Sequence, residues 1–346
     1  DILRIYGYNN VEIPTQLKST LTIAGDVDKA HHRANVVSEQ LVGEGFNEIL
    51  NNSLTKRSYY ENTGLNCYTW DNTVRVINPL SSDLGVMRQT LLFGGLETIV
   101  RNVNRKNGNL KLFELGNTYI YKKDNWTPEA PIKAYKQEGH LAMWVTGKRV
   151  SGSWAHPDED ASFYELKAYV ENVLRRIGIA HNQLVTDASD NNIFDKGLSL
   201  KNHGGKTLVE LGVLSHKLLK DFDIDVPVFY ADLDWDALMK LISKNTLTFH
   251  EISKYPAVSR DLALLVDDSV TFAQIESIAQ RAEKKLLKKV ELFDVYTGDK
   301  LPQGKKSYAV NFTLQDENKT LNEKAIDAIM KKLIHQLTTQ LGAELR

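Results

Sequence analysis

The order of strand and helix patterns over residues 254–346 is the feature that most restricts how this chain can fold. Strands are predicted where apolar and polar residues alternate with period two, most strictly over residues 307–314, and helices where apolar residues recur every three or four positions. The resulting order is a strand at 261–266, a helix at 272–284, strands at 289–296 and 307–314, a helix at 322–341 and a short final strand at 343–346.

This β-α-β-β-α-β order predicts the ferredoxin-like plan, which leaves one sheet face open and suits flat ligands such as nucleobases. Period-two alternation places Asp294 and Tyr296 on one face of their strand. Phe293 and Val295 fall on the other face, where we expect them to pack on the helices. A ring that can stack on a base and a carboxylate that can accept base N–H groups would then project together from the open face.

A chain of 346 residues is longer than a domain with a single hydrophobic core usually is, so we predict two domains and an extra fragment. We expect residues 1–14 to be the tail of an upstream domain and residues 254–346 to form the ferredoxin-like domain. Residues 15–250 between them have the pattern of a mixed α+β domain with mostly antiparallel strands. The chain starts without Met, on a helical pattern that no capping residue precedes, so we expect a piece of a longer protein.

The formal net charge is −1, so no global field indicates a nucleic-acid partner and any RNA site must be a local patch. Lysine pairs nevertheless make the last domain locally basic, at 284–285, 288–289, 305–306 and 331–332. Such pairs usually serve solubility, and an RNA-facing stripe is the alternative. Binding through such a stripe would weaken as salt rises.

The chain has a single cysteine, Cys67, which can form no internal disulfide and indicates the reducing cytosol. We therefore expect a cytoplasmic protein. A catalytic thiol is the alternative to a small, half-buried apolar side chain, which we favour because no motif places a histidine beside it. No apolar run approaches the roughly 20 residues that span a membrane.

Two charged residues of the middle domain allow a functional or a structural interpretation. Arg88 lies at a predicted helix start and could bind a phosphate. Glu114 lies inside an apolar strand and could bind an amine or a metal. We favour an arginine that ties a helix to a neighbouring loop and a glutamate that faces solvent. Neither His31–His32 nor residues 156–160 have metal-ligand spacing, and no P-loop, Rossmann glycine motif or nucleophile elbow occurs.

Passages distributed in order along nearly the whole chain resemble the β subunit of bacterial phenylalanyl-tRNA synthetase. They are Ile2–Asn10, Met87–Leu96, Asn104–Arg105 with Leu112–Gly116, Phe163–Lys167, Glu210–His216 and Tyr255–Leu262. The resemblance implies the C-terminal part of that subunit, with a class II synthetase-like domain that lacks catalytic chemistry and a ferredoxin-like anticodon-binding domain after it. Class II motif 3 is absent, and the family's HPGRSA loop is replaced by residues 194–200.

The family is implied to be an (αβ)2 tetramer that joins phenylalanine to tRNA(Phe) with ATP and Mg²⁺ in an active site of the α subunit. A C-terminal piece of the β subunit would bind the anticodon region and scaffold the α subunit, with no active site of its own. Asp1 matches the last acid of a Mg²⁺ site in the family. The other acids of that site are missing from this chain, so we expect neither Mg²⁺ nor ATP to bind it.

The resemblance also assigns anticodon-reading roles to Ala263, Asp294, Tyr296, Ser307 and Arg346. Tyr296 would stack on the first anticodon base, Asp294 and Ser307 would hydrogen-bond around it, and Arg346 would reach the RNA backbone or a base. Two alternatives stay open: an autonomous class II enzyme, which ATP–pyrophosphate exchange would reveal, and an assembly module that binds only protein, which RNA binding indifferent to Tyr296 and Asp294 would favour.

Overall fold

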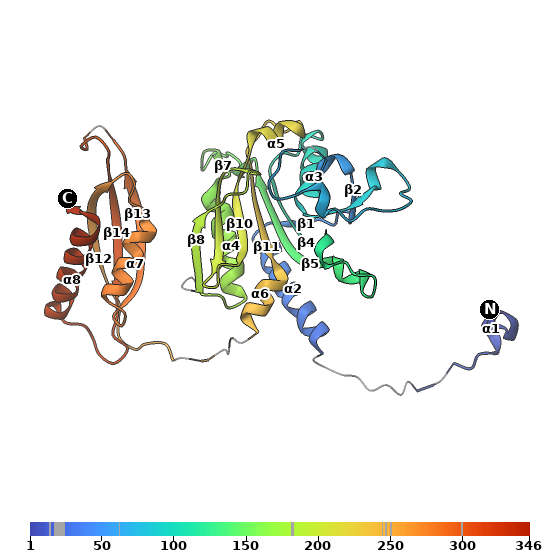
Figure 1. The fold of residues 1–346 in the computed structure, drawn as a ribbon. Coiled ribbons are helices and arrows are strands. Elements are labelled where there is room, and N and C mark those ends of the chain that lie inside the picture. The colour runs from blue at the N-terminus through green and yellow to red at the C-terminus, as the bar shows by residue number, and fades with distance from the viewer. Residues whose placement is uncertain are drawn as a thin grey trace. The chain divides into compact units, whose positions relative to one another are not determined.

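The chain divides into two compact units, Asp1–Thr246 and Leu247–Arg346 (Figure 1). The computed structural model describes residues 1–13, 15–16, 25–61, 63–180, 183–243, 245, 248–249, 251–298 and 300–346. The domain boundaries expected at residues 14 and 250 lie outside the described residues. Among the residues described, no helix has the length and apolar content to cross a membrane.

The first unit is built on a seven-stranded sheet in the order β1-β4-β5-β11-β10-β9-β8. Its strands are β1 (Asn47–Glu48), β4 (Leu110–Tyr121), β5 (Tyr135–Thr146), β8 (Leu184–Ala188), β9 (Phe194–Asn202), β10 (Thr207–Leu214) and β11 (Val228–Asp234). Only the β1–β4 pair is parallel among these strands. The predicted mixed domain with mostly antiparallel strands is thus confirmed. Two-stranded pairs are made by β2 (Leu54–Thr55) with β3 (Val86–Met87) and by β6 (Lys148–Val150) with β7 (Glu159–Asp160).

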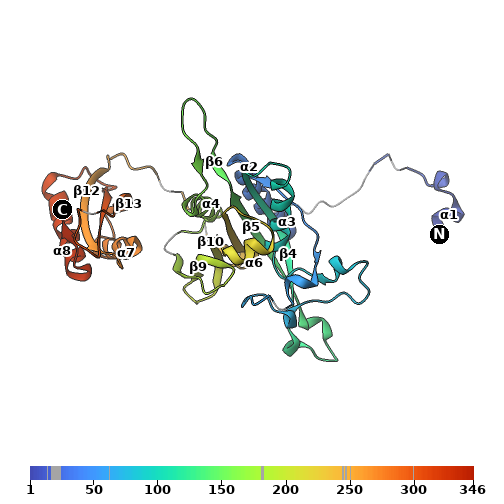
Figure 2. The same cartoon turned by 90° about the horizontal axis from the view of Figure 1, so that it is seen from above.

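Helices and loops cover both faces of the large sheet (Figures 1 and 2). One face packs against α2 (Asp26–Gly43), α4 (Phe163–Arg176) and α6 (Trp235–Ile242), and the other against α3 (Leu92–Val103) and α5 (His216–Asp221). Alternate residues of each strand supply the two cores, because successive side chains point to opposite faces.

The helix α3 lies especially close to the sheet at Gly95. A Cβ atom there would stand 2.2 Å from Cε2 of the buried Trp144 on β5, so only glycine allows this approach. The helical pattern of the sequence over 91–103 predicts this helix, which starts one residue later. The predicted helix over residues 1–6 is likewise confirmed as α1 (Ile2–Tyr6).

Three local predictions for the first unit were wrong. The sequence alternates like a strand over 46–54, but only β1 and the first residue of β2 form there, because the Asn52 side chain accepts a hydrogen bond from the Leu54 backbone and turns the chain. The strand pattern over 74–77 gives only a single bridge between Arg75 and Val86. Residues 194–200, expected as a loop, belong to β9, which pairs with strands on both sides.

Arg88 and Glu114 form an ion pair buried in the first unit. The Arg88 Nη1 atom lies 2.6 Å from Glu114 Oε1, and the guanidinium also donates to the backbone oxygens of Asn51 and Asn117. The Asn51 amide donates to the second carboxylate oxygen. Arg88 thus has the structural role that was favoured, but it ties the loop at Asn51 to β4 rather than a helix to a loop. The solvent-facing position predicted for Glu114 is wrong, because β4 is an inner strand whose two faces are both covered.

The second unit has a four-stranded antiparallel sheet in the order β13-β14-β12-β15. Its elements are β12 (Val258–Asp267), α7 (Phe272–Ala282), β13 (Leu287–Tyr296), β14 (Lys305–Leu314), α8 (Glu323–Leu341) and β15 (Glu344–Leu345). The predicted β-α-β-β-α-β order is confirmed. Both helices pack on one face of the sheet, where alternate residues of β14 from Tyr308 to Leu314 join the core.

The buried pair gives a stability prediction. Replacing Glu114 with Ala leaves the Arg88 guanidinium without its counter-charge in the interior, and we expect a loss of about 3–5 kcal/mol in the free energy of unfolding. The double replacement Arg88→Met, Glu114→Leu should cost less than Glu114→Ala, because it removes both charges. Urea unfolding followed by tryptophan fluorescence measures this unit, since all five tryptophans lie in it.

A matched control for that experiment is Glu171→Ala, which removes an exposed pair with Lys167 on α4. Its expected cost is only about 0.3–0.5 kcal/mol. If Glu114→Ala were no more destabilising than Glu171→Ala, the stabilising role of the buried pair would be refuted.

A second prediction concerns pH. Burial by itself would lower the pKa of His140, but Asp232, with its Oδ1 atom 2.8 Å from Nδ1, and then Asp234 and Glu138 raise that pKa to about 9. Because the folded-state pKa exceeds the unfolded value of about 6.5, the stabilisation is fully present below that pH and is lost as pH rises through 9. The free energy of unfolding should therefore fall between these values by roughly 3 kcal/mol more for the wild type than for His140→Gln. If the free energy of unfolding changed with pH in the same way for both proteins, the proposed contribution of His140 would be refuted.

Candidate nucleic-acid interface

The second-unit sheet turns one face toward its helices and leaves the other free of them. Register places directly paired residues on the same face. Rows of paired residues therefore cross the helix-free side, here called the open face, and three of them are Tyr296–Ser307–Leu265, Asp294–Ala309–Ala263 and Glu291–Asn311–Asp261. The intervening residues of β14 are the buried ones that meet the helices.

All five residues predicted to contact RNA come together on or beside this open face. The Arg346 backbone N–H donates to the Ala263 oxygen at 3.0 Å, which holds the chain end along β12. The Arg346 guanidinium lies 5.5 Å from the centroid of the Tyr296 ring. Tyr296 is 37% exposed, whereas its neighbour Ser307 is only 6% exposed and offers little surface to a ligand. Asp294 is exposed in the adjacent row.

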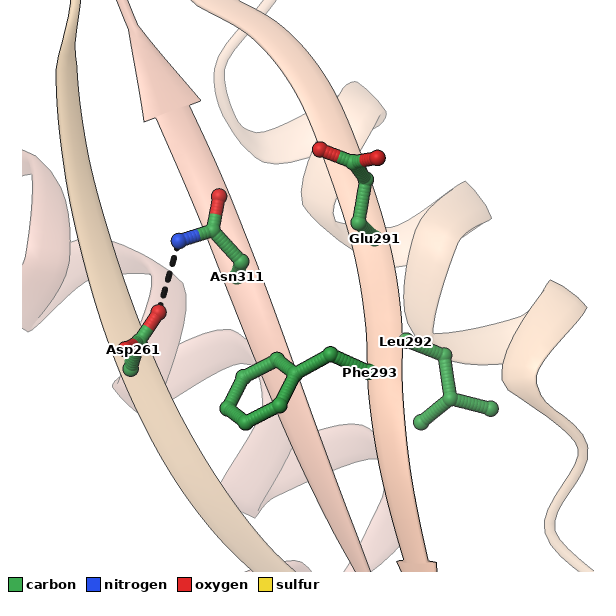
Figure 3. A pocket seen from close by; sticks show the side chains of 5 residues that line it. All are labelled: Asp261, Glu291, Leu292, Phe293 and Asn311. Atoms are coloured by element: carbon green, nitrogen blue, oxygen red, sulfur yellow. Dashed lines mark hydrogen bonds between the residues drawn. The ribbon is translucent and has the colours of Figure 1, made fainter. Parts of the chain in front are cut away.

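The predicted position of Phe293 was wrong. Phe293 is 60% exposed and does not pack on the helices. The pairing of β13 with β14 shifts between Leu292 and Asp294, which leaves Phe293 as the extra residue of a bulge. Leu292 thus points toward the helix side while the Phe293 ring lies across β14 (Figure 3). Val295 is opposite the buried Tyr308, as expected for the helix side, yet remains 48% exposed.

The bulge shapes a shallow depression of about 450 Å³ on the open face. It is lined by Asp261, Glu291, Leu292, Phe293 and Asn311 (Figure 3). The Asn311 amide donates to the Asp261 carboxylate at 2.6 Å across the two strands. Sequence reasoning missed this group, because the register shift beside Phe293 depends on how β13 pairs with β14.

The loop after β13 packs against the Tyr296 ring. A Cβ atom at Gly298 would stand 2.5 Å from the Tyr296 hydroxyl, so a larger residue there would displace the ring. The sequence pattern did not single out Gly298, because its role depends on where the ring lies in space.

Most of the lysines expected to form a basic stripe have acidic or backbone partners. The contacts are Lys288–Glu317, Lys289–Glu291, Lys305–Glu344, Lys332–Glu283 and Lys306 with the Asp268 oxygen. The four ion pairs among these contacts lie at the surface and are therefore weak, so their lysines can exchange a carboxylate for a phosphate at small cost. In the unbound protein these lysines are therefore largely neutralised and do not create a strong local positive potential.

Two other sequence-level candidates lie in the first unit. Asp1 is exposed and caps α1 without a side-chain hydrogen bond, and the described part of the chain contains no group of three His, Cys, Asp or Glu residues that could hold a metal. One carboxylate does not fit the near-octahedral shell that Mg²⁺ requires. Burial raises the pKa of the Cys67 thiol to about 12, which keeps it protonated and opposes a nucleophilic role.

Comparison with protein families agrees with this geometry. Residues 253–346 match the model of the ferredoxin-fold anticodon binding domain, which defines the second unit as a module of an aminoacyl-tRNA synthetase. Residues 13–235 match the phenylalanyl tRNA synthetase beta chain CLM domain. The chain belongs to the phenylalanyl-tRNA synthetase β chain family.

Relatives over the whole chain carry the same family name. The chain is 58% identical to the phenylalanine–tRNA ligase beta subunit of Bacteroides thetaiotaomicron and 49% identical to that of Porphyromonas gingivalis, each over 346 residues. It spans 42% of the length of both relatives. Among solved structures, pyrrolysyl-tRNA synthetase from Desulfitobacterium hafniense is 14% identical and superimposes with a TM-score of 0.45 over 61% of this chain and 68% of that one.

Proposed function

We propose that this chain is the C-terminal, noncatalytic part of a phenylalanine–tRNA ligase β subunit and that it binds the anticodon region of tRNA(Phe) in the cytoplasm. The observation that carries the proposal is the joint placement of the Tyr296 ring and the Asp294 carboxylate on an uncovered sheet face. Stacking and acceptance of base N–H groups are what recognition of an unpaired nucleotide requires.

Each side chain of the open face is proposed to have a distinct task. The Tyr296 ring stacks on a base, and the Asp294 carboxylate accepts hydrogen bonds from its edge. The small side chains of Ala263 and Ala309 leave room for the base to approach the sheet. The Arg346 guanidinium, which already lies against the Tyr296 ring, either stacks with the same base or meets its phosphate.

The first unit is proposed to scaffold the α subunit of an (αβ)2 tetramer, which would attach phenylalanine to tRNA(Phe) with ATP and Mg²⁺. Large aromatic side chains fill its sheet on the α3 side. Trp144 and Tyr230 are fully buried there, with ring centroids 5.5 Å apart, and Phe194 packs beside Tyr230. These rings give this part of the sheet to the hydrophobic core rather than to a ligand. This supports a class II synthetase-like but inert domain.

The role of the small segment before this unit is also a proposal. Residues 1–14 would be the end of an upstream domain of the β subunit, and Asp1 the last acid of a Mg²⁺ site completed by acids outside this chain. Asp1 by itself does not make such a site, and the proposed RNA binding does not depend on it.

Binding of RNA should depend on the Tyr296 ring. Tyr296→Ala is expected to weaken binding of a tRNA(Phe) transcript by about 1–3 kcal/mol, the contribution of one stacked base. Fluorescence titration at several salt concentrations measures the dissociation constant of each variant. With a transcript whose anticodon is altered, the wild type and Tyr296→Ala should bind with nearly equal affinity. The control is Val295→Ala, a neighbouring exposed apolar residue on the helix side of the same strand. If Tyr296→Ala and Asp294→Ala both bind like the wild type, a protein-only assembly module becomes the better interpretation.

The chain should also fail to activate amino acids by itself. ATP–pyrophosphate exchange with phenylalanine is expected to stay at the level of a protein-free blank, because large buried rings such as Trp144 and Tyr230 give the α3 side of the sheet to the core. Exchange clearly above that blank would establish the autonomous enzyme instead.

A further inference from the structure

A second aromatic side chain projects from the open face beside the Tyr296 group. Phe293 is 60% exposed, and its ring lies across β14 over the depression lined by Asp261, Glu291 and Asn311 (Figure 3). A large exposed ring on a sheet face gains little for folding, because most of its apolar surface stays in water. Stacking on a flat ligand would cover that surface.

The polar groups around this ring are hydrogen-bond acceptors. Asn311 donates its amide to Asp261 Oδ1 at 2.6 Å and accepts from the Thr313 hydroxyl at 3.3 Å, so its own groups are engaged and it positions the carboxylate. The second Asp261 oxygen accepts no hydrogen bond from the described residues. Glu291 adds a carboxylate whose partner is the exposed Lys289. The depression therefore presents a stacking surface with carboxylate oxygens beside it.

We propose that this depression is a second nucleobase subsite, in which the Phe293 ring stacks on an unpaired base and the Asp261 carboxylate accepts hydrogen bonds from an exocyclic amino group of that base. Adenine, cytosine and guanine carry such a group and uracil does not. The inference rests on the proposed function, because it adds a neighbouring base of the same RNA to the one at Tyr296.

Charge and spacing favour a base over other ligands. The carboxylates of Asp261, Glu291 and Asp294 repel a phosphate, so the backbone of the RNA must pass outside this part of the face. Phe293 and Tyr296 are three residues apart on one strand, a span of about 10 Å. Bases splayed from consecutive or nearly consecutive nucleotides of one loop can reach both rings.

The test uses the whole chain and an RNA hairpin that carries the tRNA(Phe) anticodon loop, with each loop nucleotide replaced in turn by an abasic one. Dissociation constants are measured for the wild type and for Phe293→Ala, Tyr296→Ala and the control Val295→Ala. We expect Phe293→Ala to weaken binding of the intact hairpin about 5- to 150-fold, the range for one stacked base. For one abasic hairpin, Phe293→Ala and the wild type should bind with the same dissociation constant. For a different abasic hairpin, the same should hold for Tyr296→Ala and the wild type.

Asp261→Asn tests the identity of the base. Uracil at the nucleotide coupled to Phe293 should weaken binding by the wild type and make little difference to Asp261→Asn, because an amide no longer offers two acceptors. Phe293→Leu, which keeps an apolar side chain without the ring, should behave like Phe293→Ala. Circular dichroism of each variant should match that of the wild type, because the changed side chains are exposed.

The outcomes separate this inference from the function on which it rests. Loss of binding in Tyr296→Ala together with wild-type binding in Phe293→Ala overturns the second subsite and leaves the proposed function standing. An effect of Phe293→Ala that is equal for every abasic hairpin also overturns the subsite. Wild-type binding by both variants refutes the subsite and the proposed function together.

Discussion

The pairing register between β13 and β14 governs what the second unit can present to a ligand. Their regular pairing sets Tyr296 opposite Ser307 and Asp294 opposite Ala309, on the side away from the helices. One extra residue, Phe293, then reverses the phase of the strand relative to Val290 and Leu292, which face the core. Without that bulge, either the apolar residues of the strand would leave the core or Asp294 and Tyr296 would turn into it.

The two units use their sheets in opposite ways. In the first unit both faces are covered, and even a charged residue such as Glu114 is buried and must be neutralised by Arg88. The rings of Trp144 and Tyr230 are buried in the core on the α3 side of that sheet. In the second unit only one face is covered, and exposed aromatic and acidic side chains accumulate on the other. This contrast is in keeping with the division proposed above, in which the first unit scaffolds and the second binds RNA.

Membership of the phenylalanyl-tRNA synthetase β chain family and the geometry of the open face are independent lines of argument. The family match rests on residues spread over the whole chain. The geometry rests on register, exposure and hydrogen bonds in one sheet. The family match places an anticodon-binding domain on the unit that carries this open face, while Ser307 is so covered that it fits a supporting position beneath the ring better than a direct contact.

The sequence by itself determined the order of elements in the second unit, the mixed character of the first, and the shared face of Asp294 and Tyr296, because local periodicity records which side of an element is apolar. It also carried the resemblance that points to the family. Only the tertiary structure decided that Glu114 is buried, that residues 194–200 form an inner strand, and that Phe293 stands on the open face. Each of these depends on strand partners distant in the chain. Which elements bury a strand, and whether its pairing shifts by one residue, depend on two or more segments of the chain together. A local sequence pattern does not contain that information.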